Sequence, residues 1–419
     1  MKIEQLYNLY TQSYLVDTDT RNIRKGSIFF ALKGANFNGN KFAEDALNNG
    51  SSFAVIDEKK YKTNSNTILV DNVLETLQKL AKYHRNQLST PIISLTGSNG
   101  KTTTKELINC VLSKKYNTIA TTGNLNNHIG VPLTLLTIQP TTEIGIIEMG
   151  ANHLNEIDFL CNIAKPNFGF ITNFGKAHLE GFGSIEGVIK AKSELYNFLR
   201  ETKGTAFINS NDSVQLKQSK NINSITFNNS EIKFIEVNPF VKVNFEGINI
   251  QSKLIGKYNY NNISAAIAIG NYFKVPLKDI KEAIENYEPT NNRSQIINKG
   301  SLKIILDAYN ANPSSMRAAL ENFSLLKDTQ KVVILGDMFE LGATSSKEHQ
   351  QIADYANSLN FDKLILIGKA FSTITVKNAL TYTCFEDFKT SNKDLNFKNT
   401  SLLIKGSRGM ALERILDLF

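Results

Sequence analysis

Short apolar runs that end in polar loops recur through the middle of the chain and predict its secondary structure. Three of them lie at residues 92–95, 144–147 and 168–171, and each has the length and composition of a buried parallel strand. Residues 184–199 place apolar side chains at helical spacing, which predicts an amphipathic helix. This alternation predicts an α/β fold with a doubly wound parallel sheet.

Two further units flank this central region. Residues 1–83 mix short apolar runs with glycine and asparagine turns, which predicts a small α/β unit, and residues 74–87 have the spacing of a connecting helix. The polar segment 288–300 interrupts the pattern. Four strand-like runs then follow, at 304–306, 332–335, 364–367 and 402–404, and predict a C-terminal Rossmann-like domain. We expect domains at residues 1–83, 84–295 and 296–419.

Length and composition agree with three soluble globular domains. The chain has 419 residues, of which 41% are hydrophobic and 21% charged, and domains commonly contain about 150 residues. No apolar run approaches the ~18 residues of a membrane span, and the first residues lack the features of a secretory signal. Three cysteines are too few for a disulfide framework. We expect a cytoplasmic protein without a membrane span.

The net charge of +8, from 47 basic and 39 acidic residues, raises the question of an anionic partner. The cluster Lys59, Lys60 and Lys62 is short and lies beside Asp57 and Glu58, and the chain has no arginine-rich arm. The charge therefore favours a small phosphorylated ligand over nucleic acid.

The clearest local motif is Gly97-Ser98-Asn99-Gly100-Lys101-Thr102-Thr103, which follows a predicted strand and precedes a predicted helix. Glycines let backbone N–H groups approach phosphate oxygens, the lysine reaches the β and γ oxygens, and a threonine hydroxyl can bind Mg²⁺. Leu95 stands where the common phosphate-loop pattern has its first glycine. The motif predicts a nucleotide phosphate site.

Other candidate residues follow strands or interrupt an apolar stripe. Glu148 and His178 come at or after the carboxyl ends of predicted strands, where α/β sheets place ligand-binding groups, so both are candidate Mg²⁺ ligands. Lys192 lies inside the apolar stripe of 184–199, where a lysine either snorkels or is held for chemistry. Asp307, Gly336-Asp337 and the segment 405–408 also follow strands, and we expect these ends to converge on one ligand crevice.

Over nearly the whole chain these residues resemble the Mur ligases of peptidoglycan synthesis, most closely the members that add D-alanyl-D-alanine. The resemblance rests on residues 19–21, 25–34, 38–39, 96–103, 122–132, 148–150, 173–178, 191–194, 256–262, 307–313, 335–342 and 405–409. It implies a small UDP-binding domain, a central ATPase domain and a C-terminal domain for the incoming dipeptide.

The resemblance also implies roles for individual residues. It implies ATP contacts by Gly97, Ser98, Asn99, Gly100, Lys101, Thr102, Thr103, Asn262, Arg293, Asp307 and Asn310. It implies two Mg²⁺ ions on Thr102, Glu148, His178 and a carbamoylated Lys192, with Lys101, Glu148, His178 and Lys192 as the catalytic set. It implies substrate contacts by Thr20, Arg21, Asn38, Thr122, Asn124, Asn126, Asn127, Lys405, Ser407 and Arg408. Tyr258 replaces the family's usual histidine, and residues 290–295 depart from its glycine-arginine form.

The implied reaction is ATP-dependent ligation of D-alanyl-D-alanine to UDP-N-acetylmuramoyl-tripeptide through an acyl phosphate, with ADP, phosphate and the UDP-muramoyl pentapeptide as products. Such an enzyme would be a monomer that serves cell-wall synthesis, cell shape and cell division. Two alternatives stay open: another ligase of the superfamily, adding diaminopimelate or lysine or acting on folylpolyglutamate, and a P-loop ATPase switch that binds nucleic acid. The sequence leaves open whether the third peptide residue is diaminopimelate or lysine.

Overall fold

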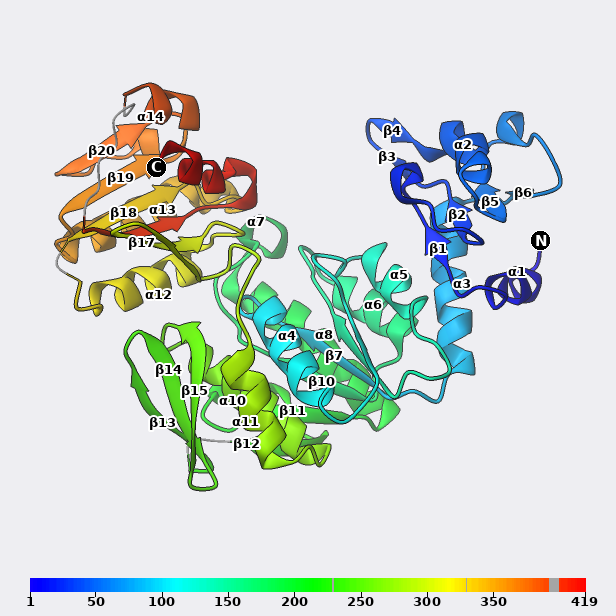
Figure 1. Ribbon diagram of the computed structural model, residues 1–419, viewed down its shortest axis with the longest axis horizontal. Helices are drawn as coiled ribbons and strands as arrows, with labels where there is room; N and C mark the ends of the chain where they lie inside the picture. The colour runs from blue at the N-terminus through cyan, green and yellow to red at the C-terminus, as the bar shows by residue number, and fades with distance from the viewer. Residues whose placement is uncertain (228–229, 329, 392–398) are drawn as a thin grey trace.

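The structure is a computed structural model that describes residues 1–227, 230–328, 330–391 and 399–419. Figure 1 shows three units, with the N-terminal unit (blue) and the C-terminal unit (yellow to red) at opposite ends and the central unit between them. This arrangement confirms the α/β architecture expected from the sequence.

The N-terminal unit is a parallel sheet in the order β1-β2-β5-β6. Its strands are β1 (Val16–Asp17), β2 (Ile28–Phe30), β5 (Phe53–Ile56) and β6 (Thr67–Leu69), with the hairpin β3 (Lys33–Gly34) and β4 (Phe37–Asn38) and the helices α1 (Ile3–Tyr10) and α2 (Ala43–Asn48).

Helix α3 (Val73–Gln87) joins this unit to the next. It begins where the Asn72 side chain accepts a hydrogen bond from the Glu75 N–H at 3.0 Å, and its apolar face lies in a hydrophobic core that both units share. Residue 83, the proposed boundary, lies inside this helix.

The central sheet is parallel throughout, in the order β12-β11-β10-β7-β9-β8. Its strands are β7 (Ile92–Thr96), β8 (Thr118–Ala120), β9 (Ile144–Glu148), β10 (Phe168–Ile171), β11 (Thr205–Asn209) and β12 (Asn223–Phe227). Its helices are α4 (Lys101–Leu112), α5 (Gly130–Leu135), α6 (Glu156–Ala164), α7 (Leu179–Phe182), α8 (Ile185–Thr202), α9 (Ser213–Gln218), α10 (Asn259–Tyr272) and α11 (Leu277–Asn286). The three predicted strands and the helix predicted at 184–199 are confirmed.

Both faces of this sheet are buried, which explains why its strands are apolar runs without alternation. Ile92 and Ile147 pack with α3, α5, α6 and α8 on one face, whereas Ile93 and Ile146 pack with α4, α10 and α11 on the other. An antiparallel sheet of β13 (Ile232–Val237), β14 (Phe240–Phe245) and β15 (Ile248–Ile255), which we did not predict, extends the second face.

The C-terminal sheet has the order β16-β17-β21-β18-β19-β20 and is parallel except for the edge strand β16. Its strands are β16 (Gln295–Lys299), β17 (Leu302–Asp307), β18 (Lys331–Gly336), β19 (Lys363–Ile367), β20 (Ala379–Tyr382) and β21 (Ser401–Lys405), and its helices are α12 (Pro313–Ser324), α13 (Ser345–Ser358) and α14 (Phe385–Ser391). The four predicted strands are confirmed. The proposed boundary at residue 295 coincides with the start of β16.

Candidate functional site

The loop between β7 and α4 needs glycine at two positions. Gly97 has φ +143° and Gly100 has φ +79°, conformations that favour glycine. A Cβ atom on Gly97 would lie 2.0 Å from Oγ1 of Thr172, and one on Gly100 would lie 2.7 Å from Oδ1 of Asn262. The loop therefore packs closely on its neighbours and leads directly into the N-terminus of α4, where backbone N–H groups favour an anion.

Hydrogen bonds from the chain after β10 hold this loop in place. The backbone N–H groups of Ser98 and Asn99 donate to Asn173, to its carbonyl at 3.1 Å and to its Oδ1 at 3.0 Å. The Thr172 hydroxyl donates to the Asn99 carbonyl at 2.6 Å, and the Ser98 hydroxyl donates to the Gly175 carbonyl at 2.7 Å. The loop is thus ordered before a ligand arrives, which reduces the entropic cost of binding.

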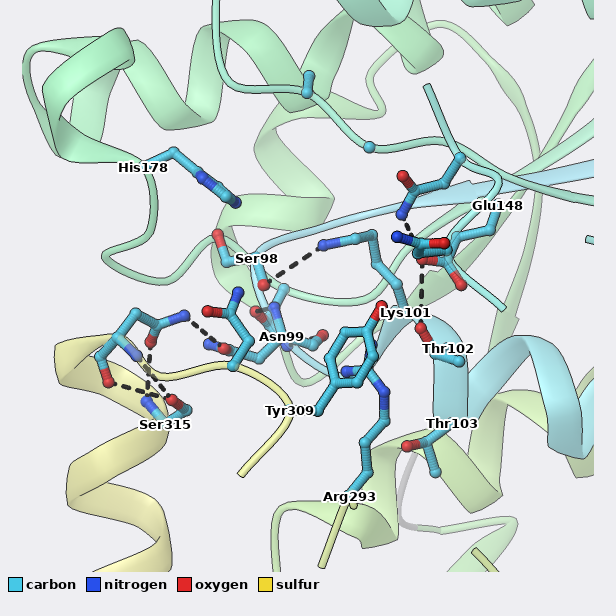
Figure 2. A pocket seen from close by; sticks show the side chains of 18 of the residues that line it. Ser98, Asn99, Lys101, Thr102, Thr103, Glu148, His178, Arg293, Tyr309 and Ser315 are labelled. Carbon is cyan, nitrogen blue, oxygen red and sulfur yellow. Dashed lines mark hydrogen bonds between the residues drawn. The ribbon is translucent and has the colours of Figure 1, made fainter. Parts of the chain in front are cut away.

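Glu148 and Thr102 form a pair that fits a magnesium ion. Glu148 is only 1% exposed, and its Oε1 accepts hydrogen bonds from the Thr102 hydroxyl at 3.2 Å and from Asn126 Nδ2 at 2.8 Å (Figure 2). Its Oε2 has no hydrogen-bond partner among the residues that the structure describes. A buried carboxylate oxygen without a donor is costly unless a cation binds it, and carboxylate and hydroxyl oxygens suit Mg²⁺.

Lys101 lies in the same region and is held by the loop itself. Its Nζ donates to the Gly97 carbonyl at 2.7 Å. Burial lowers the pKa of Lys101, and the nearby charge of Glu148 partly offsets this effect. A phosphate placed at the loop would favour the charged amine further, as in other phosphate sites.

His178 stands opposite Lys101 across the loop, in the view of Figure 2. It has φ +52°, directly before α7, and its Nδ1 makes an ion pair with Oε2 of Glu340 from the C-terminal domain. The contact with His178 lowers the pKa of Glu340, and the charge of Lys101 contributes to the same shift.

Lys192 is fully buried on α8, in agreement with its place in the apolar stripe. Its Nζ donates to the Ala151 carbonyl at 3.1 Å and lies 5.0 Å from the Phe182 ring centre. Burial lowers the pKa of this amine well below its usual range, and the positive charge of Lys101 adds to the shift. Lys192 therefore does not snorkel to solvent.

The C-terminal domain contributes a partly buried ion pair. Lys405, 2% exposed, donates to Oδ2 of Asp307 at 2.5 Å and to the Asn310 carbonyl at 3.2 Å. Oδ1 of Asp307 accepts the backbone N–H of Ser294 at 3.1 Å. The charge of Lys405, a predicted substrate contact, is thus already paired with Asp307.

The segment that links the two domains carries a stacked pair of side chains. The Arg293 guanidinium lies 3.8 Å from the centre of the Tyr309 ring (Figure 2). Next to it, the Tyr258 hydroxyl and the Ser294 hydroxyl are 2.8 Å apart. The tyrosine that replaces the family's usual histidine therefore contacts the linker.

Most of these groups border one cavity of about 880 Å³ between the central and C-terminal domains. Of the predicted residues, its lining includes Ser98, Asn99, Gly100, Lys101, Thr102, Thr103, Asn124, Asn126, Asn127, Glu148, His178, Asn262, Arg293, Asp307, Asn310 and Lys405. In the described part of the chain, no group of three or more His, Cys, Asp or Glu side chains gathers as a metal site. A metal here would thus need hydroxyl or ligand oxygens besides Glu148.

The other predicted residues lie outside this lining: Thr20, Arg21, Asn38, Gly97, Thr122, Lys192, Ser407 and Arg408. Arg21 pairs with Asp19 at 2.6 Å, and Arg408 pairs with Glu413 at 2.7 Å. The expected convergence of strand ends is wrong for Asp337. Its carboxylate accepts the backbone N–H groups of Ala370 and Phe371, at 2.9 and 3.0 Å, and so faces away from the cavity.

Sequence reasoning missed part of the lining. The segment just after β9 contributes Asn152, Leu154, Asn155, Glu156 and Phe159. Its position directly after Glu148, at the carboxyl end of a strand, was a signal that could have identified it. Glu340 was missed as an individual residue, because its contact with His178 depends on how two domains dock.

A glycine-rich phosphate loop with an adjacent buried carboxylate, facing a second Rossmann-like domain, defines a multidomain nucleotide-binding protein. Three family models match the chain: "Mur ligase family, catalytic domain" at residues 13–85, "Mur ligase middle domain" at 95–270, and "Mur ligase, glutamate ligase domain" at 292–408. The chain belongs to the Mur ligase family.

Relatives of this chain are similar along most of their length. The UDP-N-acetylmuramoyl-tripeptide–D-alanyl-D-alanine ligase of Bacillus subtilis (strain 168) is 35% identical, and the alignment covers 96% of this chain and 92% of the relative. The protein of the same name from Escherichia coli (strain K12) is 32% identical, with the same coverages.

Solved structures agree with this assignment. A crystal structure of MurF from Acinetobacter baumannii superposes with a TM-score of 0.84 at 30% identity, covering 96% of this chain and 92% of that one. MurF from Thermotoga maritima in complex with ADP gives 0.83 at 26% identity, covering 97% and 96%. No helix among the described residues is both long and apolar enough to span a membrane.

Proposed function

We propose that this protein is the ATP-dependent ligase that joins D-alanyl-D-alanine to UDP-N-acetylmuramoyl-tripeptide in peptidoglycan precursor synthesis. The names of the full-length relatives support this function. The observation that carries it is the single cavity in which the phosphate loop and Glu148 of the central domain meet Asp307 and Lys405 of the C-terminal domain. Such a cavity can hold a nucleotide together with the reacting ends of two organic substrates across a domain boundary.

In the first step, a carboxylate oxygen of the tripeptide attacks the γ-phosphorus of ATP, the bond to the β–γ bridging oxygen breaks, and ADP leaves. An acyl phosphate forms. Lys101 and the N–H groups at the start of α4 bind the phosphate oxygens and stabilise the charge that spreads over them. Thr102, Glu148 and His178 would hold magnesium, which when bound neutralises phosphate charge and orients the reacting oxygens.

In the second step, the free amine of D-alanyl-D-alanine attacks the acyl carbon. The amine loses a proton, the tetrahedral intermediate collapses, and inorganic phosphate leaves as the amide forms. Closure of the two domains over the cavity would limit the access of water to the acyl phosphate, which would otherwise hydrolyse.

We also propose that Lys192 is carbamoylated. Its neutral amine would add to CO₂ and release one proton, which gives an N-carboxylate that can ligate a second magnesium ion. The proposal is supported by complete burial and by the lowered pKa, because only the neutral amine reacts with CO₂.

Substrate contacts by Thr20, Arg21 and Asn38 in the N-terminal unit, and by Ser407 and Arg408 in the C-terminal domain, remain proposals. The domain boundaries, the monomeric state and the cytoplasmic location also remain predictions.

The decisive experiment measures phosphate release with ATP, Mg²⁺ and UDP-N-acetylmuramoyl-tripeptide, with and without D-alanyl-D-alanine. We expect release that depends on both substrates, with the UDP-muramoyl pentapeptide detected by mass spectrometry. Release that needs no dipeptide would refute the proposal. Turnover with a dipeptide substrate and free diaminopimelate or lysine, or with folate and glutamate, would favour another superfamily ligase.

The carbamate is tested by Lys192→Ala. We expect activity to be lost and to return in part when a short carboxylate such as acetate is added. Wild-type turnover without acetate would show that the lysine amine has no role in the reaction.

A further inference from the structure

A carboxylate from the C-terminal domain contacts a histidine of the central domain at the edge of the phosphate site. Glu340 lies between β18 and α13, and its Oε2 makes an ion pair with Nδ1 of His178. Its backbone carbonyl also accepts the N–H of Glu180 at 3.1 Å. Glu340 therefore contacts the segment 178–180 through both its backbone and its side chain.

This contact determines which nitrogen of His178 is left for other chemistry. Nδ1 makes no aligned hydrogen bond with any described residue, so the contact with Glu340 is electrostatic. A carboxylate beside Nδ1 favours the proton on that nitrogen and leaves Nε2 as the free acceptor. Figure 2 shows the imidazole ring pointing from its loop toward the space above Ser98 and Lys101. The imidazole ring is therefore directed toward the place where phosphate and metal would bind.

The turn that carries Glu340 has a backbone conformation that places it against α7. Glu340 has φ +60° and Gly342 has φ +52°, so the turn contains two residues in the left-handed region. A Cβ atom on Gly342 would lie 3.4 Å from Cα and Cβ of Glu180. The turn thus packs directly on α7, and a non-glycine residue in a positive-φ conformation is commonly retained at functional sites.

We propose that Glu340 is a positioning residue that holds the His178 imidazole in the orientation of a metal ligand, and that it does so only when the C-terminal domain is docked. The inference rests on the proposed function for the role of His178 itself. Docking of the C-terminal domain, which would receive the amine substrate, would then complete the metal site. Phosphoryl transfer would be favoured only when this domain is in place.

Other contacts between the two domains provide a matched control, because they hold the interface without touching His178. Lys176 Nζ pairs with Glu348 at 2.8 Å, and the Asn312 amide donates to Asn99 Oδ1 at 2.8 Å. Glu348→Gln weakens the Lys176 pair in the same way that Glu340→Gln weakens the contact with His178. A difference between the two variants separates positioning from docking.

The experiment uses Mn²⁺ as the probe, with the full-length protein and a non-hydrolysable ATP analogue. Mn²⁺ affinity is measured for wild type, Glu340→Gln, Glu348→Gln, His178→Ala and the double variant of positions 340 and 178. Pulsed EPR reports whether a histidine nitrogen is bound to the manganese ion.

We expect a nitrogen signal in the wild-type protein that is lost in His178→Ala and strongly reduced in Glu340→Gln. Loss of such an orienting partner commonly costs 10–100-fold in metal affinity, and we expect a weakening in that range for Glu340→Gln and less than about twofold for Glu348→Gln. In the His178→Ala background, Glu340→Gln should add nothing, because the residue acts through the imidazole.

Any of three results with the variants would overturn the inference: a wild-type nitrogen signal in Glu340→Gln, an equal loss of affinity in Glu348→Gln, or an undiminished effect of Glu340→Gln without His178. The last would indicate a simple effect of charge. Absence of the nitrogen signal in the wild-type protein would also overturn it. These measurements need no tripeptide turnover, so their failure is distinct from failure of the substrate assay.

Discussion

Replacing Glu148 by glutamine should stabilise the ligand-free protein while removing its response to magnesium. The substitution keeps the shape of the side chain, and Oε1 can still accept hydrogen bonds from Thr102 and Asn126. The amide group takes the position of Oε2, the buried oxygen without a hydrogen-bond partner among the described residues. A buried charge is thereby replaced by a neutral group.

The size of the effect follows from the cost of an unsatisfied buried group, about 1–3 kcal/mol and more when it is charged. The amide N–H group is also unsatisfied, so we expect a net gain of about 1 kcal/mol, or about 2–4 °C in the melting temperature of the central domain. Mg²⁺ and an ATP analogue at 100 times their Kd should stabilise the wild-type protein by about 2.7 kcal/mol, and the variant should lose most of this increment.

Glu194→Gln is the matched control, with the opposite expected sign. Both oxygens of Glu194 accept backbone N–H groups, from Asn155 at 2.7 Å and from Asp158 at 3.0 Å. An amide N–H there would face another N–H, which costs about 1–3 kcal/mol. Calorimetry with and without Mg²⁺ and nucleotide measures both variants. A lower melting temperature for ligand-free Glu148→Gln, or an unchanged increment with ligand, would refute the reasoning.

Two further predictions concern the phosphate loop and the shared core. Gly97→Ala should weaken nucleotide binding by at least about tenfold in titration calorimetry, because the collision with Thr172 and the φ of +143° each cost about 1–3 kcal/mol. Gly247→Ala is the control, because Gly247 has φ +81° and no atom lies within 4 Å of its added Cβ, and it should leave binding unchanged. Equal binding by both variants would count against the collision. Burial lowers the pKa of His84 below 6.5, so the unfolded chain binds the extra proton first, and the stability from the neutral imidazole is lost as pH falls below about 6.5. His84→Gln should therefore flatten the rise of unfolding free energy with pH, by up to about 1.4 kcal/mol per pH unit in urea titrations, and an unchanged slope would contradict this.

The sheets could be predicted because their signal is local. The strands β7, β9 and β10 are continuous apolar runs, since helices bury both faces of the sheet. The phosphate loop could also be predicted, because its positive φ values at positions 97 and 100 favour glycine and so leave a recognisable glycine spacing. The antiparallel sheet β13–β15 was missed, although two of its strands alternate between buried and less buried positions.

Residue charges were predicted less well than residue positions. Lys405 and Asp307 were both placed correctly at strand ends, yet the sequence did not indicate that they neutralise each other. Asp337 has the same kind of position and turns instead toward two backbone N–H groups. Adjacent strand ends are close in space, but a side chain's direction depends on the donors that the rest of the fold brings near it.

Local sequence patterns were enough to predict the three α/β units, the phosphate loop and the position of Lys192 in an apolar stripe, because hydrophobic period and glycine spacing act over a few neighbouring residues. Two other features came from the packing of the folded chain: Glu148 keeps one oxygen without a hydrogen-bond partner among the described residues, and Glu340 makes an ion pair with His178 across a domain boundary. Those contacts join residues far apart in the chain, and their geometry is set by the packing of whole domains, which no local pattern records.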